Sequence, residues 1–328
     1  MKKEIKIFYS QDWKDYELLD TGEEEKLEKF GQYIFVRPYE DAVWKKTLNE
    51  KEWAKADGKF WSSKVGAKAG WKFKLSRSNL DNKLEKKWEM SYKGIKFLAS
   101  PTPFRHLGFF PEQASHWDFI ERKIKEALTP QGLALGSLKA RPFPAKPIKF
   151  LNLFGYTGVA SLFALRAGAD VTHIDASKQT IQWVKENQKF NNLDIRCPSG
   201  HRMSGMRVIE DDTVKFIERE EKRGNKYDAV IMDPPKFGRG PKGEIWKIEK
   251  DLPKLLSQVR KILSDKPLFV ILNSYSINLS SLSLGYALED AMSGFNGEVS
   301  SGELCLLEKS NNRTISLSST AIWENKKL

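Results

Sequence analysis

The segment with the most specific chemistry is DPPKFG, residues 233–238, which directly follows an apolar run. Two consecutive prolines hold the chain in an extended turn, so the carbonyl of Pro234 stays exposed as an acceptor beside the carboxylate of Asp233. Phe237 adds a flat aromatic ring four residues after the carboxylate. Hydrogen-bond acceptors beside a flat ring make this segment the first candidate for a reaction centre.

Three further segments also follow apolar runs. Gly155 and Gly158 lie in LNLFGYTGVAS, where the backbone can approach a ligand closely and the next helix N-terminus favours a negatively charged group. Asp175 can accept hydrogen bonds from both hydroxyls of a ribose, and the run Glu210-Asp211-Asp212 can accept from an adenine amino group. Each acid can instead cap the helix that follows it. The G-x-G-x-x-G spacing of dehydrogenases is absent.

Alternating strands and helices position these segments. Apolar runs predict strands at 148–154, 171–174, 206–210, 227–233 and 267–275. Helical spacing predicts helices at 114–128, 159–167, 177–190, 213–221 and 247–263. Apolar strands that alternate with helices are typical of a parallel sheet covered on both faces, whose ligands bind at the carboxyl ends of the strands. We therefore expect the four segments to meet at one edge of the sheet.

Both ends of the chain predict antiparallel strands. After about residue 294, two alternating runs flank a polar turn at Lys309–Asn312. Residues 1–99 contain short runs such as QYIFVRP, WKFKLS and IKFLAS, separated by Gly, Asn and Asp. We predict a doubly wound, Rossmann-like α/β domain at 100–328 that ends in an antiparallel hairpin. A small β-rich domain at 1–99 precedes it, with the boundary in the proline-punctuated segment SPTPFRHLGFFPEQ.

Positive charge and tryptophan are concentrated in one part of the chain. The 328 residues carry a net charge of +12, and residues 51–98 alone hold 13 basic and five acidic side chains. Lysines interleaved with aromatic rings are typical of surfaces that bind single-stranded nucleic acid. The alternative is that the tryptophans form the core of the β-rich domain. For the lysines we favour an anionic partner such as RNA. Five of the ten tryptophans fall in or near this region: Trp44, Trp53, Trp61, Trp71 and Trp88.

Composition excludes several classes of protein. Two cysteines make neither a disulfide framework nor a cysteine-based zinc site, and the four histidines lack metal-ligand spacing. No run approaches the roughly 20 apolar residues that span a bilayer, and the N-terminus lacks the apolar core of a signal peptide. We expect a basic cytoplasmic protein with neither metal nor membrane partner. The sequence leaves a homo-oligomer open.

The motifs LNLFGYTGVAS, HIDAS, EDDTVKF and DPPKFGRG, with the upstream GFFPEQ, resemble those of class I S-adenosylmethionine-dependent methyltransferases. More narrowly, they resemble the bacterial 23S rRNA large-subunit methyltransferase family over about residues 100–328. The resemblance implies S-adenosylmethionine as cofactor, S-adenosylhomocysteine as product and a nucleic-acid acceptor. It also implies that the region before residue 100 corresponds to the small β-rich domain of these enzymes.

The resemblance assigns a role to each site residue by position. It implies that Gln113 reaches the cofactor, that Asp212 faces the adenine amine and that Asp233 lies between methyl donor and acceptor. The ribose is assigned to Asp175, followed by Ala176 and Ser177. The methionine part is assigned to five consecutive residues: Phe154, Gly155, Tyr156, Thr157 and Gly158.

One difference from the family pattern helps to decide whether the methyl acceptor is a carbon or a nitrogen of the base. Members that methylate carbon 5 of cytosine use a cysteine after the fifth strand, whereas residues 272–276 here read LNSYS. Cys197 lies in a polar insertion, and Cys305 lies in an apolar strand where a small core residue is expected. Because carbon methylation needs a covalent adduct, it is disfavoured. The Asp233 and Pro234 acceptors instead suit a base nitrogen, with Phe237 stacking on a base swung out of its helix.

The sequence therefore favours a methyltransferase that acts on a base nitrogen in RNA, with ribosomal RNA as the first candidate. Three alternatives stay open. The acceptor can be a protein or a small molecule, or it can be carbon 5 of cytosine in RNA. The chain can also be an RNA-binding module that retains a cofactor fold without catalysis.

Overall fold

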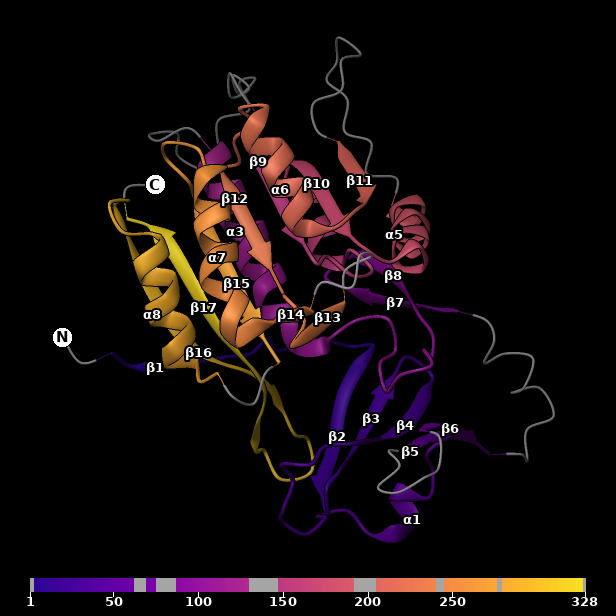
Figure 1. The fold of residues 1–328 in the computed structure, drawn as a ribbon. Coiled ribbons are helices and arrows are strands. Elements are labelled where there is room, and N and C mark those ends of the chain that lie inside the picture. Colours follow the sequence, from indigo (N-terminus) through magenta and orange to yellow (C-terminus); the bar gives the residue numbers. More distant parts are fainter. Residues whose placement is uncertain are drawn as a thin grey trace. The chain divides into compact units, whose positions relative to one another are not determined.

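The structure, a computed structural model, describes residues 3–61, 69–74, 87–129, 147–191, 205–239, 245–275 and 279–326. The chain forms two compact units, and it passes between them several times. The first unit comprises Met1–Phe8, Ser115–Leu304 and Leu317–Leu328, and the second comprises Tyr9–Ala114 and Cys305–Ser316. Figure 1 shows the elements of both units in the colours of the sequence.

An eight-stranded sheet lies at the centre of the first unit, with the order β1-β16-β17-β15-β12-β9-β10-β11. Five of its strands pair in parallel: β9 (Lys149–Leu153), β10 (Asp170–Asp175), β11 (Met206–Glu210), β12 (Ala229–Met232) and β15 (Phe269–Ser274). The hairpin strand β17 (Thr314–Asn325) runs antiparallel to β15, and β16 (Gly297–Leu307) lies beside it. The predicted doubly wound sheet with an antiparallel C-terminal hairpin is confirmed.

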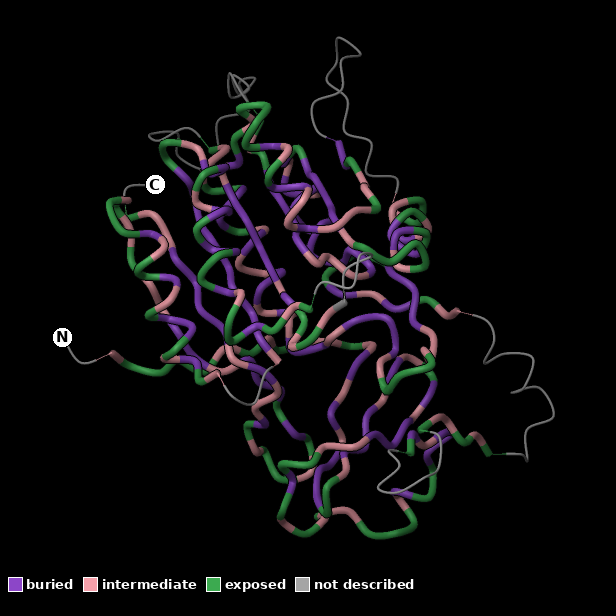
Figure 2. The backbone as a smooth tube through the Cα atoms, in the orientation of Figure 1, coloured by how far each residue is buried: buried purple, intermediate pink, exposed green. Residues whose placement is uncertain are grey.

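Helices cover both faces of this sheet (Figure 1). On one face, α6 (Thr213–Lys222), α7 (Ile248–Lys261) and α8 (Ser281–Ala291) enclose a core with the strand residues Leu151, Val230 and Leu272. On the other face lie α3 (Ala114–Leu128), α4 (Val159–Arg166) and α5 (Lys178–Asn191). There Trp117 of α3 stacks on Phe163 of α4 with ring centroids 5.6 Å apart. Figure 2 shows buried strands between helices whose outer sides are exposed.

Strand register aligns the carboxyl ends of the central strands. Leu153 at the end of β9 pairs with Ile174 on one side and with Met232 on the other. Met232 in turn pairs with Leu272 of β15. Because β9 connects through α4 to β10 on one side while β12 lies on the other, strand order reverses between β9 and β12, which is where doubly wound sheets bind ligands.

The elements of the first unit that were not predicted include a helix and an edge strand. The segment that forms α8 contains Gly285 and several serines, which are poor helix formers, so its sequence does not indicate a helix. It begins at Ser280, whose Oγ accepts a hydrogen bond from the backbone N–H of Ser283 at 3.1 Å. A side chain at Gly285 would lie 2.9 Å from Ser301, so close packing explains the glycine. The second element is β1 (Ile5–Phe8), which pairs in parallel with β16 at the sheet edge.

The second unit is rich in strands, as predicted. A five-stranded sheet has the order β2-β3-β4-β5-β6. Its strands are β2 (Tyr16–Gly22), β3 (Glu25–Phe30), β4 (Tyr33–Pro38), β5 (Gly58–Trp61) and β6 (Gly70–Phe73). All neighbours are antiparallel except β4 and β5, which the short helix α1 (Glu50–Trp53) connects in parallel. A hairpin of β7 (Trp88–Tyr92) and β8 (Ile95–Ala99) and the 3-10 helix η1 (Pro111–Gln113) complete the unit.

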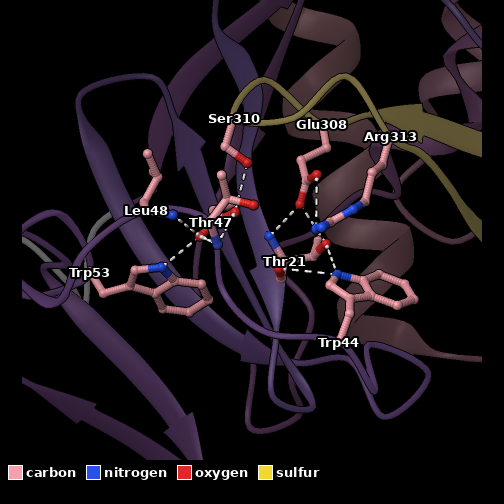
Figure 3. Close-up of polar contacts among 9 residues, drawn as sticks. Thr21, Trp44, Thr47, Leu48, Trp53, Glu308, Ser310 and Arg313 are labelled. Carbon is pink, nitrogen blue, oxygen red and sulfur yellow. Dashed lines mark hydrogen bonds and ion pairs between the residues drawn. The ribbon is translucent and has the colours of Figure 1, made fainter.

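The hairpin tip between β16 and β17 belongs to this second unit (Figure 3). The buried Glu308 carboxylate accepts hydrogen bonds from the backbone N–H of Thr21 at 2.6 Å and from its hydroxyl at 2.5 Å. Ser310 donates to the buried carboxylate of Asp20 at 2.6 Å, which also accepts from the indole of Trp53. The compact units therefore differ from a single division at 99/100, because these polar contacts fix residues 305–316 among strands of the N-terminal region.

Candidate active site

The candidate site lies at the edge of the first unit's sheet where β9, β10, β12 and β15 end. The turn after β9 has an unusual backbone. Three of its residues have positive φ: Phe154 at 56°, Tyr156 at 52° and Gly158 at 85°. This conformation is sterically unfavourable for Phe154 and Tyr156 but not for glycine. Hydrogen bonds hold the turn in place, from Gly155 N–H to the Ile174 carbonyl at 2.9 Å and from Gly158 N–H to the Gly155 carbonyl at 3.1 Å. Strain of this kind is concentrated at functional sites.

Gly155 is required by close packing. A Cβ there would lie 2.3 Å from Cε1 and 2.6 Å from Nδ1 of His173. That imidazole is fully buried in β10, and the hydroxyl of Ser161 lies 3.0 Å from its Nδ1. Burial lowers the pKa of His173 to about 4, so the ring is neutral at pH 7. His173 therefore packs against the turn and limits its shape.

Asp175 at the end of β10 holds the turn and the start of α5 together. Its Oδ2 accepts from Tyr156 N–H at 2.9 Å, and its Oδ1 accepts from Ser177 N–H at 2.9 Å and from the Thr180 hydroxyl at 2.7 Å. A carboxylate offers about four acceptor positions, so these bonds leave roughly one for a ligand. Ala176 and Ser177 follow it and are exposed. Thr157, which is buried, accepts at its carbonyl from the Asn187 amide at 2.9 Å.

Asp212 caps α6. Its Oδ1 accepts from the backbone N–H of Lys215 at 2.9 Å, which is the capping alternative that the sequence left open. Capping occupies one oxygen, so the proposed contact with an adenine amine depends on the other. Gln113 ends η1 in the second unit.

Asp233, which follows β12, is oriented by a chain of side chains from two other strands. The amide of Asn273, at the end of β15, donates to Asp233 Oδ1 at 3.2 Å. Ser318 of β17 donates to the Asn273 carbonyl oxygen at 3.2 Å, and Asn273 is completely buried. Asn273 thus supplies a positioning amide near the end of β15, in the LNSYS segment where the family resemblance would put the thiol of a carbon methylase. The sequence contained this signal, but the LNSYS segment was considered only as a place for a nucleophile.

After Asp233 the chain forms a small hairpin of β13 (Phe237–Arg239) and β14 (Ile245–Lys247) that was not predicted. Pro234 is buried, whereas the side chain of Phe237 is 61% exposed. The Trp246 indole donates to the Pro235 carbonyl at 2.6 Å, and its ring lies 6.3 Å from that of Phe154. Trp246 therefore connects the turn after β12 with the turn after β9.

Some residues considered in the sequence lie outside the described residues: Cys197, Ser276 and His201, one of the four histidines. Cys305 is buried, as expected for a small core residue. In the described ranges no group of three or more His, Cys, Asp or Glu side chains could hold a metal ion. Those ranges also contain no helix long and apolar enough to cross a membrane.

Comparison with known proteins assigns the class. A crystal structure of an S-adenosylmethionine-dependent methyltransferase from Agrobacterium tumefaciens is 37% identical and superimposes with a TM-score of 0.83, covering 99% of this chain and 97% of the other. A putative methyltransferase of this kind from Streptococcus mutans has a TM-score of 0.65 at 15% identity, covering 96% and 76% of the two chains, which shows the shared fold. The chain belongs to the S-adenosylmethionine-dependent methyltransferases.

Curated relatives match over a shorter stretch. Ribosomal RNA large subunit methyltransferase K of Neisseria meningitidis is 32% identical over 146 residues, or 43% of this chain and 39% of that protein. The corresponding K/L protein of Pseudoalteromonas translucida is 33% identical over 132 residues, which cover 40% of this chain and 17% of that protein. The chain thus matches less than half of the length of these relatives. No family model matches it.

Proposed function

We propose that this methyltransferase modifies a nitrogen of a base in ribosomal RNA. The observation that carries the proposal is the Asp233 carboxylate, held by Asn273 beside a 61% exposed Phe237. Both named K-type relatives are ribosomal RNA methyltransferases. To test it, labelled S-adenosylmethionine is supplied with total RNA or total protein from cells that lack this chain. Label in RNA supports the proposal, and label only in protein would replace it with the alternative acceptor.

The residues that follow β9, β10 and β11 suggest where each part of the cofactor binds. We propose that the methionine part lies along the turn Phe154, Gly155, Tyr156, Thr157 and Gly158. The free N–H groups of α4, which begins after Gly158, favour its carboxylate. The remaining acceptor position of Asp175 receives a ribose hydroxyl beside Ala176 and Ser177. The second oxygen of Asp212 accepts from the adenine amine.

The acceptor base is positioned by the DPPKF segment. The cofactor supplies a methyl group on a positively charged sulfur, which is already activated, so alignment provides most of the rate enhancement. Asp233 and the Pro234 carbonyl accept hydrogen bonds from the base edge and direct the nitrogen lone pair toward the methyl group. Phe237 stacks on the extruded base. Asn273 keeps Asp233 in place, because its own amide is held by Ser318.

Carbon-5 methylation lacks its nucleophile in the described part of the site. The buried Asn273 stands at the end of β15, followed by Ser274, which is 1% exposed. A serine hydroxyl is a weaker nucleophile than a cysteine thiolate. We therefore retain nitrogen as the acceptor atom.

Asp175→Asn is expected to weaken the binding of S-adenosylhomocysteine by about 10- to 150-fold, the value of a charge-assisted hydrogen bond. The substitution removes the charge and places an amide donor against the N–H groups of Tyr156 or Ser177. Isothermal titration calorimetry measures the change. Thr180→Val is the matched control, because it removes one donor to Asp175 while the carboxylate stays. Equal affinities for Asp175→Asn and wild type would exclude Asp175 from the cofactor site.

Trp246→Phe is expected to lower kcat by about 2- to 10-fold, the worth of one hydrogen bond of about 0.5–1.5 kcal/mol. Phenylalanine keeps a ring beside Phe154 but cannot donate to the Pro235 carbonyl. Trp246→Ala loses both contacts, so we expect a larger decrease in kcat. Single-turnover kinetics measure the effect, with Lys250→Ala on the exposed side of α7 as control. A kcat unchanged in both Trp246 variants would show that the hairpin does not position the reaction centre.

We also propose a division of labour between the two regions of the sequence. The N-terminal region, 1–99 in the sequence-based division, binds the RNA, and 100–328 binds the cofactor and transfers the methyl group. The excess of basic side chains at 51–98 supports this proposal. If the region neutralises several phosphates, RNA affinity decreases steeply with salt, at about 0.7 log units per log unit for each contact. A flat salt dependence would contradict it.

A further inference from the structure

The outer face of β5 and β6 in the second unit combines an exposed indole with lysines. In the antiparallel pair, Phe60 lies opposite Trp71 and both rings pack into the aromatic core, 5.4 Å apart. Side chains alternate between the faces of a sheet, so Lys59, Trp61 and Lys72 share the other face. There the side chain of Trp61 is 52% exposed.

Trp61 differs in this respect from the other four tryptophans of the region. Trp53 is 5% exposed and donates to Asp20, and Trp44 donates to the Thr21 carbonyl at 3.2 Å. Trp71 donates to the Thr102 carbonyl at 2.9 Å, and Trp88 packs against Tyr33 at 4.8 Å. Trp53 is therefore a core residue, as in the structural alternative, and the other three are half-buried with partners inside the unit. Packing does not account for Trp61.

Open space lies beside the exposed indole. Gly70 is the cross-strand partner of Trp61, and a Cβ added there would meet nothing within 4 Å. Glycine places no side chain opposite Trp61, whereas directly opposed side chains of larger residues can contact each other. The glycine therefore leaves a face of the indole accessible to a flat ligand.

The charges around the indole favour an anion. Lys59 and Lys72 are direct cross-strand partners, an arrangement that costs free energy because like charges face each other. Glu25 forms an ion pair with Lys59, whereas Lys72 has no ion pair within the described residues. The Lys59 ammonium also lies 4.8 Å from the Trp61 ring centroid. A phosphate near Lys72 would relieve the repulsion and keep a neighbouring base within reach of the ring.

We propose that Trp61, Lys59 and Lys72 form a binding surface for unpaired RNA, on which a base stacks on the indole and Lys72 contacts an adjacent phosphate. The proposal rests on the proposed function for the class of partner, and it assigns the contact to a surface outside the DPPKF segment. Stacking on one ring tolerates any base, so the surface adds affinity rather than sequence specificity. A duplex buries its base faces and would gain only the phosphate contact.

The test uses the full chain and a 12-nucleotide single-stranded RNA with a central 2-aminopurine, whose fluorescence reports stacking. Trp61→Ala is expected to weaken binding by about 5- to 150-fold, and Trp61→Phe to retain part of the affinity. Lys72→Gln is expected to reduce the slope of log affinity against log salt by about 0.7. The matched control is Phe104→Ala, another exposed aromatic side chain of the same unit at 71%.

Four outcomes would overturn the assignment. These are equal binding of Trp61→Ala and wild type, an equal loss in Phe104→Ala, a duplex bound as tightly as the single strand, and wild-type binding to phosphatidylserine vesicles but not to RNA. Methyl transfer to ribosomal RNA is measured with the same proteins. If Trp61→Ala methylates and binds RNA like wild type, only this surface is wrong. If the wild type methylates no RNA, the proposed function fails as well.

Discussion

Asp233→Ala is expected to lower kcat for methyl transfer by about 100- to 10,000-fold, the range for a group that positions or accepts a proton from the reacting atom. Alanine removes both acceptor oxygens, and it leaves the amide of Asn273 without the partner it has at 3.2 Å. The acceptor nitrogen would then lose the hydrogen bond that directs its lone pair. Asp233→Asn keeps one acceptor oxygen, so we expect an intermediate value.

Cofactor binding separates this effect from a loss of folding. Since we propose that Asp233 acts mainly on the methyl acceptor, the affinity of Asp233→Ala for S-adenosylhomocysteine should change by less than about tenfold. Asp290→Ala, an exposed acid of α8, is the control for removal of a carboxylate. A kcat of Asp233→Ala close to that of wild type would remove Asp233, and the mechanism built on it, from the account.

Gly155→Ala is expected to lower the free energy of unfolding by about 1–3 kcal/mol, the cost of overpacking a dense interior. The new Cβ would lie 2.3 Å from a ring atom of His173, which is completely buried and so has no open space to enter. The turn between Phe154 and Gly158 must then shift, and S-adenosylhomocysteine should bind more than about tenfold more weakly. Thermal unfolding and calorimetry measure the two effects.

Two further variants test whether the contact with His173 causes the loss of stability in Gly155→Ala. Gly70→Ala adds the same methyl group where a Cβ meets nothing within 4 Å, so it should leave the unfolding midpoint unchanged. In a His173→Ala background the clash partner is absent, and Gly155→Ala should cost less stability there than in wild type. Equal costs in the two backgrounds would mean that the contact with His173 does not require the glycine.

The strands and helices of residues 100–328 were predictable because their apolar runs and helical spacing are pronounced. The run at 227–233 is almost wholly apolar, and the structure has β12 at Ala229–Met232. The helix predicted at 114–128 is α3 at Ala114–Leu128. Parallel strands buried on both faces need such runs, so local sequence and tertiary position agree there.

Elements whose position depends on distant residues were not predictable. The strand β1 has a largely exposed pattern and exists as a strand through its pairing with β16, almost 300 residues away. The hairpin tip at 305–316 contains the predicted polar turn, but nothing in the local sequence indicates that Glu308 accepts a hydrogen bond from Thr21. Contacts between segments so distant in the sequence can be identified only in the three-dimensional structure.

The candidate site was predictable as a set of strand ends, and its internal support was not. Alternating strands and helices placed Gly155, Asp175 and Asp233 at one edge, and the register of the strands agrees. The sequence did not indicate that Asn273 orients Asp233, because an amide at a strand end has many uses. It also did not reveal the β13–β14 hairpin, so Trp246 was missed as the link between two turns.

The most direct test of the central claim is the location of the methyl group. Ribosomal RNA from cells that lack this chain is incubated with the purified protein and labelled S-adenosylmethionine, and the modified nucleotide is mapped by mass spectrometry. We predict a methyl group on a base nitrogen, absent when Asp233→Ala replaces wild type. Methylation of a base carbon or a ribose hydroxyl, or no transfer to this RNA, would contradict the account.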